Sequence, residues 1–501
     1  MISEYDGPRP TTWQENPTFT KMVQDGTPFT ANSHEGPLPP LEDRVPIESD
    51  RLVWDVVDEI GEYGGTWRMA HENNWLLGTR VLARGEAVHF AGDYLTKVPI
   101  FLKGFESSAD GRVHTFTLRD GMKFSNGEPV DMAAVTFAHE ALNNNVELHP
   151  SVPAMWRDPI TGNSVTFAAV DDHVFTYTFE NPNFGAVEGG TPGGVSYCAG
   201  WCMFAPVQWT SNLVPGYANA DVLQASIDDA DVEDWIANIK TRLSVHSTQA
   251  GDMPRVGPFL QVEGKTSGEK LILVANPYHT IFDPEGNQVP YVDGIDSMGF
   301  ESRDIAVFRA MNGESDATAV PYAVGELPLY QSNMEKGDYS LYQWTDFGGG
   351  DVGFMLNQTF NADPEIGRLL RTKDFRIAIS VAIDREEMND NVLLGLGSPQ
   401  NAIPHPSHPY YPGPEWATLD IEHDPARANQ LLDSIGLVDT DGDGIRNRIG
   451  DLTGDTSNFK LFMEVPQGGH TSDRYLGIIQ LIEEDLAAVG FTLEWKLAPS
   501  V

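Results

Sequence analysis

The chain has 501 residues, of which 41% are hydrophobic and 21% are charged. A chain of this length exceeds what one hydrophobic core supports, so two or three domains are expected. The formal net charge is −41, from 32 basic and 73 acidic residues. Because so large a negative excess repels nucleic-acid phosphates and anionic lipid surfaces, it argues against both as partners.

The acidic balance has two interpretations that the sequence leaves open. It can serve general solubility, or it can be an adaptation to salty surroundings that screen self-repulsion. Only 11 of the 32 basic residues are lysine, which favours the second interpretation. Neither interpretation names a ligand.

The termini and cysteines bear on the location of the protein. No apolar run approaches the roughly 18 residues that a membrane helix needs, so no membrane span is predicted. The N-terminus has no basic start followed by an apolar core, and therefore no secretory signal is predicted within the chain. Cys198 and Cys202 are spaced for a local disulfide only if the segment bends, so a bridge and two ordinary thiols both remain open.

The first part of the chain predicts an extended arm followed by β structure. Residues 1–62 are rich in Pro, Thr, Asp and Glu and have weak periodicity, as in an arm lying over a domain. Between two Asp-Gly turn signals, His114, Phe116 and Leu118 alternate with polar neighbours that include Arg119, which predicts a half-buried strand. Asp131 is a candidate N-cap for the helix that follows.

The second half predicts alternating strands and helices. Residues 174–179 and 255–300 carry further strand and turn signals. Helical apolar spacing follows over residues 305–311, 366–394 and 475–489, and a strand is expected at 353–357. Strands alternating with helices indicate an α/β domain.

Four segments, in this order, resemble the family 5 solute-binding proteins of ABC importers. Residues 110–130, with their paired Asp-Gly turns, resemble the most recognisable stretch of that family. The next three characteristic regions of the family resemble residues 255–278, 374–385 and 424–432. The segments 36–68 and 283–293 are similar to a subgroup with a long N-terminal arm, some of whose members bind oligosaccharides.

The resemblance implies an α/β, two-lobed periplasmic-binding-protein-like fold with an inserted β-rich subdomain. Family members continue well past a segment like residues 490–496, so the resemblance also predicts that this chain is truncated at the C-terminus. The implied division is an N-terminal arm (1–62) on domain I, a discontinuous domain I (63–89 and 205–302) whose C-terminal return is missing, an inserted β-rich domain II (90–204), and an incomplete α/β domain III (303–501).

The implied function is that of the extracytoplasmic substrate-binding component of an ABC transporter, not of an enzyme. Such a protein captures a peptide or an oligosaccharide between two lobes and delivers it to permease subunits. It works in the periplasm or at the cell surface. Two alternatives stay open: a ligand-presenting sensor protein of the same fold, and a glycoside or peptide hydrolase, although no serine-nucleophile, phosphate-loop or zinc-protease motif is found.

Ligand contacts are expected in loops, where aromatic faces stack on sugars or pack against peptide side chains. For each of these aromatic residues, ordinary core packing is an equal alternative. Weaker candidates are Tyr410, Tyr411 and Trp416 in a proline-rich loop. The predicted ligand-binding residues are Asn74, Trp75, Tyr197, Trp201, Phe354 and Asn357.

No cofactor is predicted, with calcium as the one candidate exception. Asp439, Asp441 and Asp443 match positions 1, 3 and 5 of a calcium loop, and glycine follows at position 6. The acid expected at position 12 is replaced by Gly450, and Asp451 falls one place late. A simple Asp-Gly turn is the competing interpretation.

Overall fold

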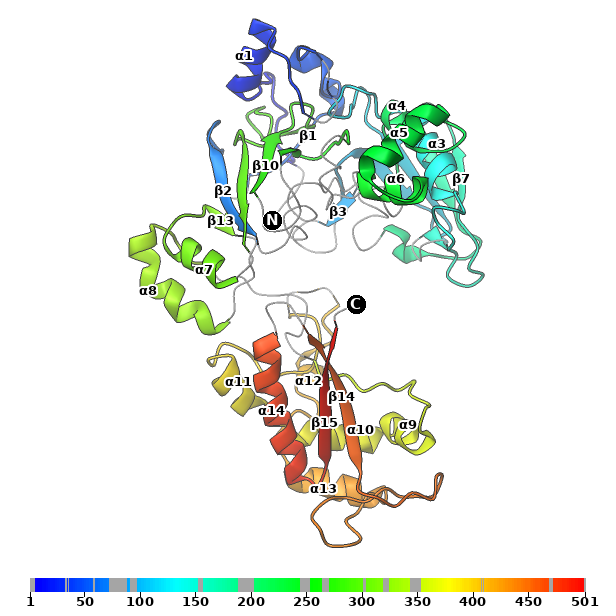
Figure 1. Ribbon diagram of the computed structural model, residues 1–501, viewed down its shortest axis with the longest axis vertical. Coiled ribbons are helices and arrows are strands. Elements are labelled where there is room, and N and C mark those ends of the chain that lie inside the picture. The colour runs from blue at the N-terminus through cyan, green and yellow to red at the C-terminus, as the bar shows by residue number, and fades with distance from the viewer. Residues whose placement is uncertain are drawn as a thin grey trace. The chain divides into compact units, whose positions relative to one another are not determined.

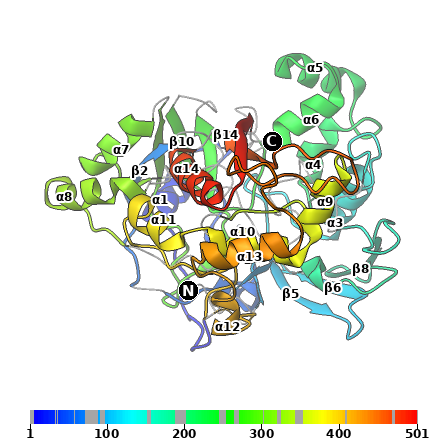
Figure 2. The same ribbon diagram turned by 90° about the horizontal axis from the view of Figure 1, so that it is seen from below.

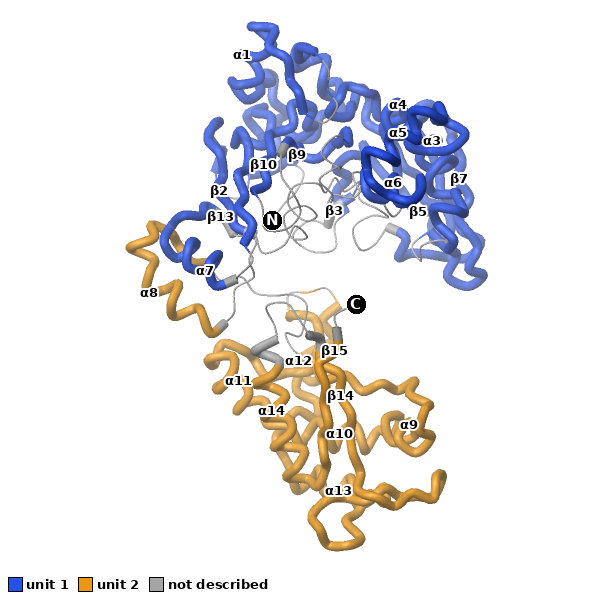
Figure 3. Tube along the Cα trace, in the orientation of Figure 1, with its two compact units in different colours: residues 1–320 blue, residues 321–501 orange. Residues whose placement is uncertain are grey.

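A computed structural model describes most of the chain, which divides into two compact units, residues 1–320 and 321–501 (Figure 3). The first unit holds α7 (Arg303–Met311), and the predicted four-part domain division stays a prediction. The described residues are 5–31, 34, 36–56, 59–71, 88–90, 97–151, 156–187, 202–243, 253–263, 270–300, 303–318, 324–342, 353–406, 408, 410–467 and 472–499.

A mixed five-stranded sheet forms one part of the first unit (Figure 1). Its strand order is β13-β2-β12-β10-β9, in which β2 pairs in parallel with both β13 and β12, while β10 is antiparallel to β12 and β9. Apolar side chains of these strands form a small core of their own. The strands are β2 (Thr66–His71), β9 (Phe259–Glu263), β10 (Lys270–Ala275), β12 (Gly294–Gly299) and β13 (Ala317–Thr318).

A four-stranded antiparallel sheet, in the order β5-β6-β8-β7, forms a second part of the first unit. His114, Phe116 and Leu118 are buried on β6, as the alternating pattern predicts. Phe116 stacks on Phe175 of β8 with ring centroids 5.3 Å apart. The strands are β5 (Leu102–Ser107), β6 (Val113–Leu118), β7 (Thr166–Ala169) and β8 (Val174–Thr178).

The helix expected after this hairpin begins where its cap predicts. The carboxylate of Asp131 accepts a hydrogen bond from the backbone N–H of Ala134 at 3.0 Å and so caps α3 (Met132–Phe137). The helix continues as a π-helical segment, Ala138–Asn143. The apolar face of this segment is buried in a core that also contains Leu213 and Ile239.

One prediction about this sheet is wrong. Arg119 was expected on the exposed face of its strand, but the residue lies just past β6 and is 6% exposed. Its guanidinium donates hydrogen bonds to the carbonyl oxygens of Ile100 at 2.8 Å, Asp50 at 2.7 Å and Pro99 at 3.2 Å. A buried charge of this kind is tolerated because several acceptors replace its water.

The N-terminal arm packs against the rest of the first unit and contains a helix that its composition did not predict. Asn16 caps α1 (Pro17–Asp25), whose first position is a proline. Apolar side chains of the arm, including Phe19 and Phe29, form a core with Leu260 of β9 and Ala275 of β10. Arg44, which forms a buried ion pair with Glu15 within the arm, adds to this contact by donating to the carbonyl oxygen of Pro277.

The remaining regular elements of the first unit are short. The pair β1–β11 is parallel and the pair β3–β4 is antiparallel. These elements are β1 (Leu52–Val53), β3 (Val88–Phe90), β4 (Lys97–Pro99), β11 (Ile281–Phe282), α4 (Val207–Thr210), α5 (Ala220–Ala230) and α6 (Trp235–Leu243), with 3-10 turns at Leu41–Asp43, Glu48–Asp50, Phe184–Val187 and Ser211–Leu213.

The second unit places helices against a parallel strand pair, β14 (Lys460–Gln467) and β15 (Thr492–Pro499). Helix α14 (Ser472–Ala488) connects the two strands, as is usual for parallel neighbours. Figures 1 and 2 both show α10 lying beside α13, and these helices share one core with the strands. The other helices of this unit are α8 (Leu327–Gly337), α9 (Pro364–Arg371), α10 (Lys373–Ala382), α11 (Arg385–Val392), α12 (Pro414–Ala417) and α13 (Pro425–Ser434), with a 3-10 turn at Val324–Glu326.

Two sequence expectations fail in the second unit. The continuous helix predicted over 366–394 is three helices, because Thr372 and Ile383 take extended backbone conformations and Asp384 caps a new helix. The strand predicted at 353–357 is not assigned there, although these residues are described. The apolar periodicity predicted correctly which side chains of these helices are buried, but it did not predict where one helix ends and the next begins.

Candidate functional site

Four of the six predicted ligand-binding residues lie outside the described residues. These four are Asn74, Trp75, Tyr197 and Trp201. Cys198 lies outside them too, so the question of a bridge to Cys202 stays open. Cys202 itself is buried, and its backbone N–H and carbonyl bond the side-chain amide of Asn143.

The other two predicted residues, Phe354 and Asn357, lie in the segment before α9. Phe354 is partly buried against the core of the second unit, which favours the packing alternative for this ring. Asn357 is exposed, and its side-chain oxygen accepts hydrogen bonds from the backbone N–H of Thr359 at 3.0 Å and from its hydroxyl at 2.8 Å. This Asn turn orders the chain before α9. A ligand role for either residue stays a prediction.

More exposed aromatic rings lie in the proline-rich segment around α12. Tyr410 is 69% exposed and Trp416 is 53% exposed. The Asn401 side chain holds this segment by donating to the carbonyl oxygens of Trp416 at 2.9 Å and Leu419 at 2.8 Å. Exposed rings on a fixed backbone can stack on a sugar or pack against a peptide, so this segment competes with Phe354 as a ligand contact.

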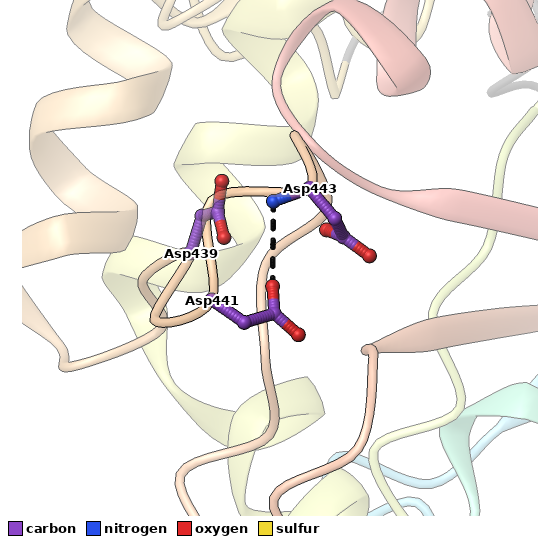
Figure 4. A group of neighbouring side chains, drawn as sticks. All are labelled: Asp439, Asp441 and Asp443. Carbon is purple, nitrogen blue, oxygen red and sulfur yellow. Dashed lines mark hydrogen bonds between the residues drawn. The ribbon is translucent and has the colours of Figure 1, made fainter.

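The three predicted metal ligands, Asp439, Asp441 and Asp443, do come together (Figure 4). Each offers a carboxylate oxygen, these oxygens lie within 4.8 Å of one another, and all three residues are exposed. The turn that gathers them depends on Gly442 and Gly444, whose φ angles of 79° and 90° are left-handed and suit glycine.

Backbone N–H groups already occupy part of this carboxylate cluster. Asp439 accepts from the N–H of Gly442 at 2.7 Å and from that of Gly444 at 2.9 Å. These two bonds, with Gly444 contributing more, lower the pKa of Asp439 below its ordinary value. Asp443 accepts from Ile445 N–H and from the Asn458 amide. These bonds favour the ionised form of Asp439, which an oxygen-preferring cation requires.

The residues expected to complete a calcium shell are used elsewhere. Gly450, at position 12, donates its N–H to Glu365 at 3.2 Å. The Asp451 carboxylate, one place later, forms a bidentate ion pair with Arg368, with one N–O distance of 2.8 Å. The three aspartates thus fit a cation only with water as the further ligands, and calcium binding stays a prediction.

One histidine–carboxylate pair lies at the start of α11. His423 Nδ1 lies 2.8 Å from Asp384 Oδ2. The same Asp384 side chain accepts from the N–H of Glu387 and caps α11, and its pKa is lowered, first by that bond. Burial raises the pKa of the neighbouring Asp485, whose carboxylate accepts from the N–H of Asp384. These contacts join α11 to α14, which is a structural role.

Among the described residues, no helix combines the length and apolar character needed to cross a bilayer.

The residues of the second unit that resemble the family also have structural partners. Arg376 donates to the carbonyl oxygens of Leu370 at 3.2 Å and Arg371 at 2.6 Å, and so it closes the C-terminus of α9.

Comparison with known proteins identifies relatives for nearly the whole chain. The family described as "Bacterial extracellular solute-binding proteins, family 5 Middle" matches residues 96–500. A periplasmic alpha-galactoside-binding protein of Rhizobium meliloti (strain 1021) is 24% identical over 463 residues, which cover 82% of this chain and 59% of that protein. The chain thus spans about three-fifths of the length of this relative.

Solved structures have the same fold. A structure described as "oligopeptide-binding protein OppA" has a TM-score of 0.72 and 25% identity, with 98% of this chain and 73% of that chain covered. The periplasmic binding protein MelB of Agrobacterium fabrum C58, in complex with stachyose, has a TM-score of 0.63 and 19% identity, with 100% and 72% covered. The predicted two-lobed periplasmic-binding-protein-like α/β fold is confirmed.

Proposed function

The chain belongs to the family 5 bacterial extracellular solute-binding proteins, and we propose that it is the substrate-binding component of an ABC importer. It captures a peptide or an oligosaccharide outside the cytoplasm, in the periplasm or at the cell surface, and delivers it to permease subunits. The observation that supports this most is the family match over residues 96–500, four-fifths of the chain. The bound molecule is released unchanged, so the chain has no reaction to catalyse.

The two compact units suit this function. Each unit has hydrophobic cores of its own, so each can move as a body while its internal packing stays intact. In a binding protein of this kind the ligand acts by favouring the closed arrangement of two lobes, which the permease then distinguishes from the open one. We propose that this chain responds to its ligand in the same way.

The ligand class remains a choice between two. The names of the relatives support both, since one binds alpha-galactosides, another is an oligopeptide-binding protein, and a third holds stachyose. Aromatic side chains serve either ligand, because a ring stacks on a sugar face and also packs against an apolar peptide side chain. In this chain we assign ring contacts to the aromatic residues among the six predicted ones and to the exposed rings of Tyr410 and Trp416, and polar contacts to Asn74 and Asn357.

A thermal-shift screen tests the function. A ligand that binds only the folded state raises the melting temperature by mass action, so a ligand at 100 times its Kd adds about 2.7 kcal/mol of stability. We expect a shift with members of one panel, either di- to hexapeptides or galactosides such as stachyose. Chromatography of the recovered ligand should show it intact. Absence of a shift with both panels, or hydrolysis of the ligand, would refute the proposal.

Single variants then locate the site. Trp416→Ala and Tyr410→Ala should weaken ligand binding if these exposed rings contact the ligand, by about 0.5–1.5 kcal/mol each. The matched control is Tyr217→Ala, an aromatic residue of similar exposure, 53%, in the first unit. If both variants bind as the unaltered chain does while the chain itself binds, the ligand contacts lie elsewhere and the function stands.

A further inference from the structure

A buried histidine joins the N-terminal arm to the rest of the first unit. The imidazole of His34 lies 3.0 Å from the carbonyl oxygen of Phe29 through Nδ1, and 3.1 Å from the hydroxyl of Tyr278 through Nε2. His34 is 8% exposed and Tyr278 is 2% exposed. Tyr278 belongs to the turn after β10, so the second contact spans the interface between arm and sheet.

These partners fix the protonation state of the ring. A carbonyl oxygen only accepts, so Nδ1 carries the proton. In the neutral ring Nε2 then accepts from the Tyr278 hydroxyl, and both ring nitrogens are satisfied. A second proton, on Nε2, would force the tyrosine hydroxyl to turn away and find another acceptor in a buried setting.

Charged groups around the ring oppose a second proton. Arg44 is fully buried and lies over the Tyr278 ring at 5.9 Å. Its guanidinium pairs with Glu15 and also donates to the carbonyl oxygens of Pro39 and Pro277. Glu15 pairs with Arg44, and no described carboxylate bonds to the His34 ring. Glu35 lies outside the described residues.

The electrostatic balance agrees with this geometry. Burial, the largest cause, lowers the pKa of His34, and the nearby charge of Arg44 lowers it further, while the bond to Phe29 raises it. The folded arm therefore holds His34 neutral at pH values where a solvent-exposed histidine is charged. As the pH falls through the ordinary value of about 6.5, the released arm gains a proton that the docked arm does not, and docking weakens.

We propose that the arm, residues 16–31 and 36–45 together with His34, is an acid-releasable cover on β9 and β10, and that the His34–Tyr278 contact is its pH-sensitive latch. Release uncovers the apolar surface that the arm shares with the sheet. That surface includes Phe19, Phe29 and Leu38 from the arm and Leu260 and Ala275 from the strands. The release is local, since the sheet beneath has further strands and a core of its own.

Hydrogen exchange of the full chain, corrected for intrinsic rates, tests the proposal. Between pH 7.5 and 5.0, one histidine that is protonated only when released increases the opening constant by at most about thirtyfold. We expect a severalfold to thirtyfold increase in peptides from the arm. Amides of β10 and β12 should exchange more slowly than those of the arm at both pH values, because they open with a larger unit.

Two variants complete the test. His34→Gln retains a donor and an acceptor but cannot titrate, so its arm opening should vary less than twofold over the same pH range. His173→Gln, at a half-exposed histidine before β8, is the control and should behave as the unaltered chain does. If the arm of His34→Gln does not dock at pH 7.5, the variant gives no comparison. The pH dependence of arm opening in the unaltered chain then decides whether the proposal holds. An arm that opens only together with β10 and β12, or with the same pH dependence in His34→Gln, overturns the proposal.

Discussion

His139 should make the stability of the first unit dependent on pH. Its ring is 6% exposed in the π-helical turn after α3 and lies 4.6 Å from the Phe167 ring. The Asn144 amide nitrogen lies 2.9 Å from Nε2, which therefore accepts, so the neutral ring carries its proton on Nδ1. Burial lowers the pKa of His139 from 6.5 to about 4.

The sign and size of the effect follow from linkage. Between pH 6.5 and 4 the unfolded chain binds a proton that the folded chain excludes, so the free energy of unfolding falls as the pH falls. The contribution is fully present above pH 6.5. A shift of about 2.5 pH units corresponds to about 3 kcal/mol, most of which, about 2.5 kcal/mol, is lost between pH 7.5 and 4.5.

The perturbation is His139→Gln, which retains an acceptor for Asn144 but cannot titrate. The variant loses ring packing at every pH, so the informative quantity is the difference in unfolding free energy between the two proteins as a function of pH. Other buried histidines, including His279, contribute equally to both proteins and cancel. Hydrogen exchange at β8 amides reports the free energy of opening where the ring lies.

The advantage of the unaltered chain should shrink by about 2.5 kcal/mol between pH 7.5 and 4.5. His173→Gln again serves as the control, because its half-exposed ring is solvated in both states. Parallel pH profiles for the unaltered chain and His139→Gln would refute the reasoning. They would mean that the folded unit admits the proton, for example through a flip of the Asn144 amide.

Three further outcomes are expected. Arg119→Met should lower the unfolding free energy by about 3 kcal/mol in urea titrations, because two buried carbonyl oxygens and one partly buried carbonyl oxygen lose their donor; a loss below 1 kcal/mol would contradict this. Millimolar Ca²⁺, but not Mg²⁺, should raise the melting temperature, and Asp441→Asn should abolish the increase; equal melting curves with and without Ca²⁺ would end the calcium prediction. Raising NaCl from 0.1 to 1 M should raise the melting temperature, because salt screens the repulsion within a chain of net charge −41; an unchanged value would contradict the salt interpretation.

Local signals in the sequence predicted local structure well. The alternation around Phe116 gave the strand β6 with the correct face buried, and Asp131 gave the start of α3. Both depend on neighbours within a few residues, which is the range that periodicity and capping describe. The α/β class followed from the same local patterns.

Predictions that depend on distant residues failed or stayed open. Arg119 was expected on the exposed face, because nothing near it in the sequence shows that Asp50 and Ile100 supply acceptors. The breaks at Thr372 and Ile383 were missed for a similar reason, since the apolar face continues across them. Periodicity reports which residues are buried, while long-range contacts decide where the backbone turns.

The residues that reveal the family are fold determinants, which is why they leave the ligand class open. Gly111, Gly121 and Gly127 have φ angles of 67°, 79° and 90°, so each is required by a left-handed turn. Arg376 donates from Nη1 to carbonyl oxygens at the end of α9, and Asp384 caps α11. Bonds made within the fold hold these side chains in place and leave them less able to reach a ligand. Specificity must therefore reside in residues outside these motifs, and binding measurements on loop variants such as Trp416→Ala carry more information about the ligand than the motifs do.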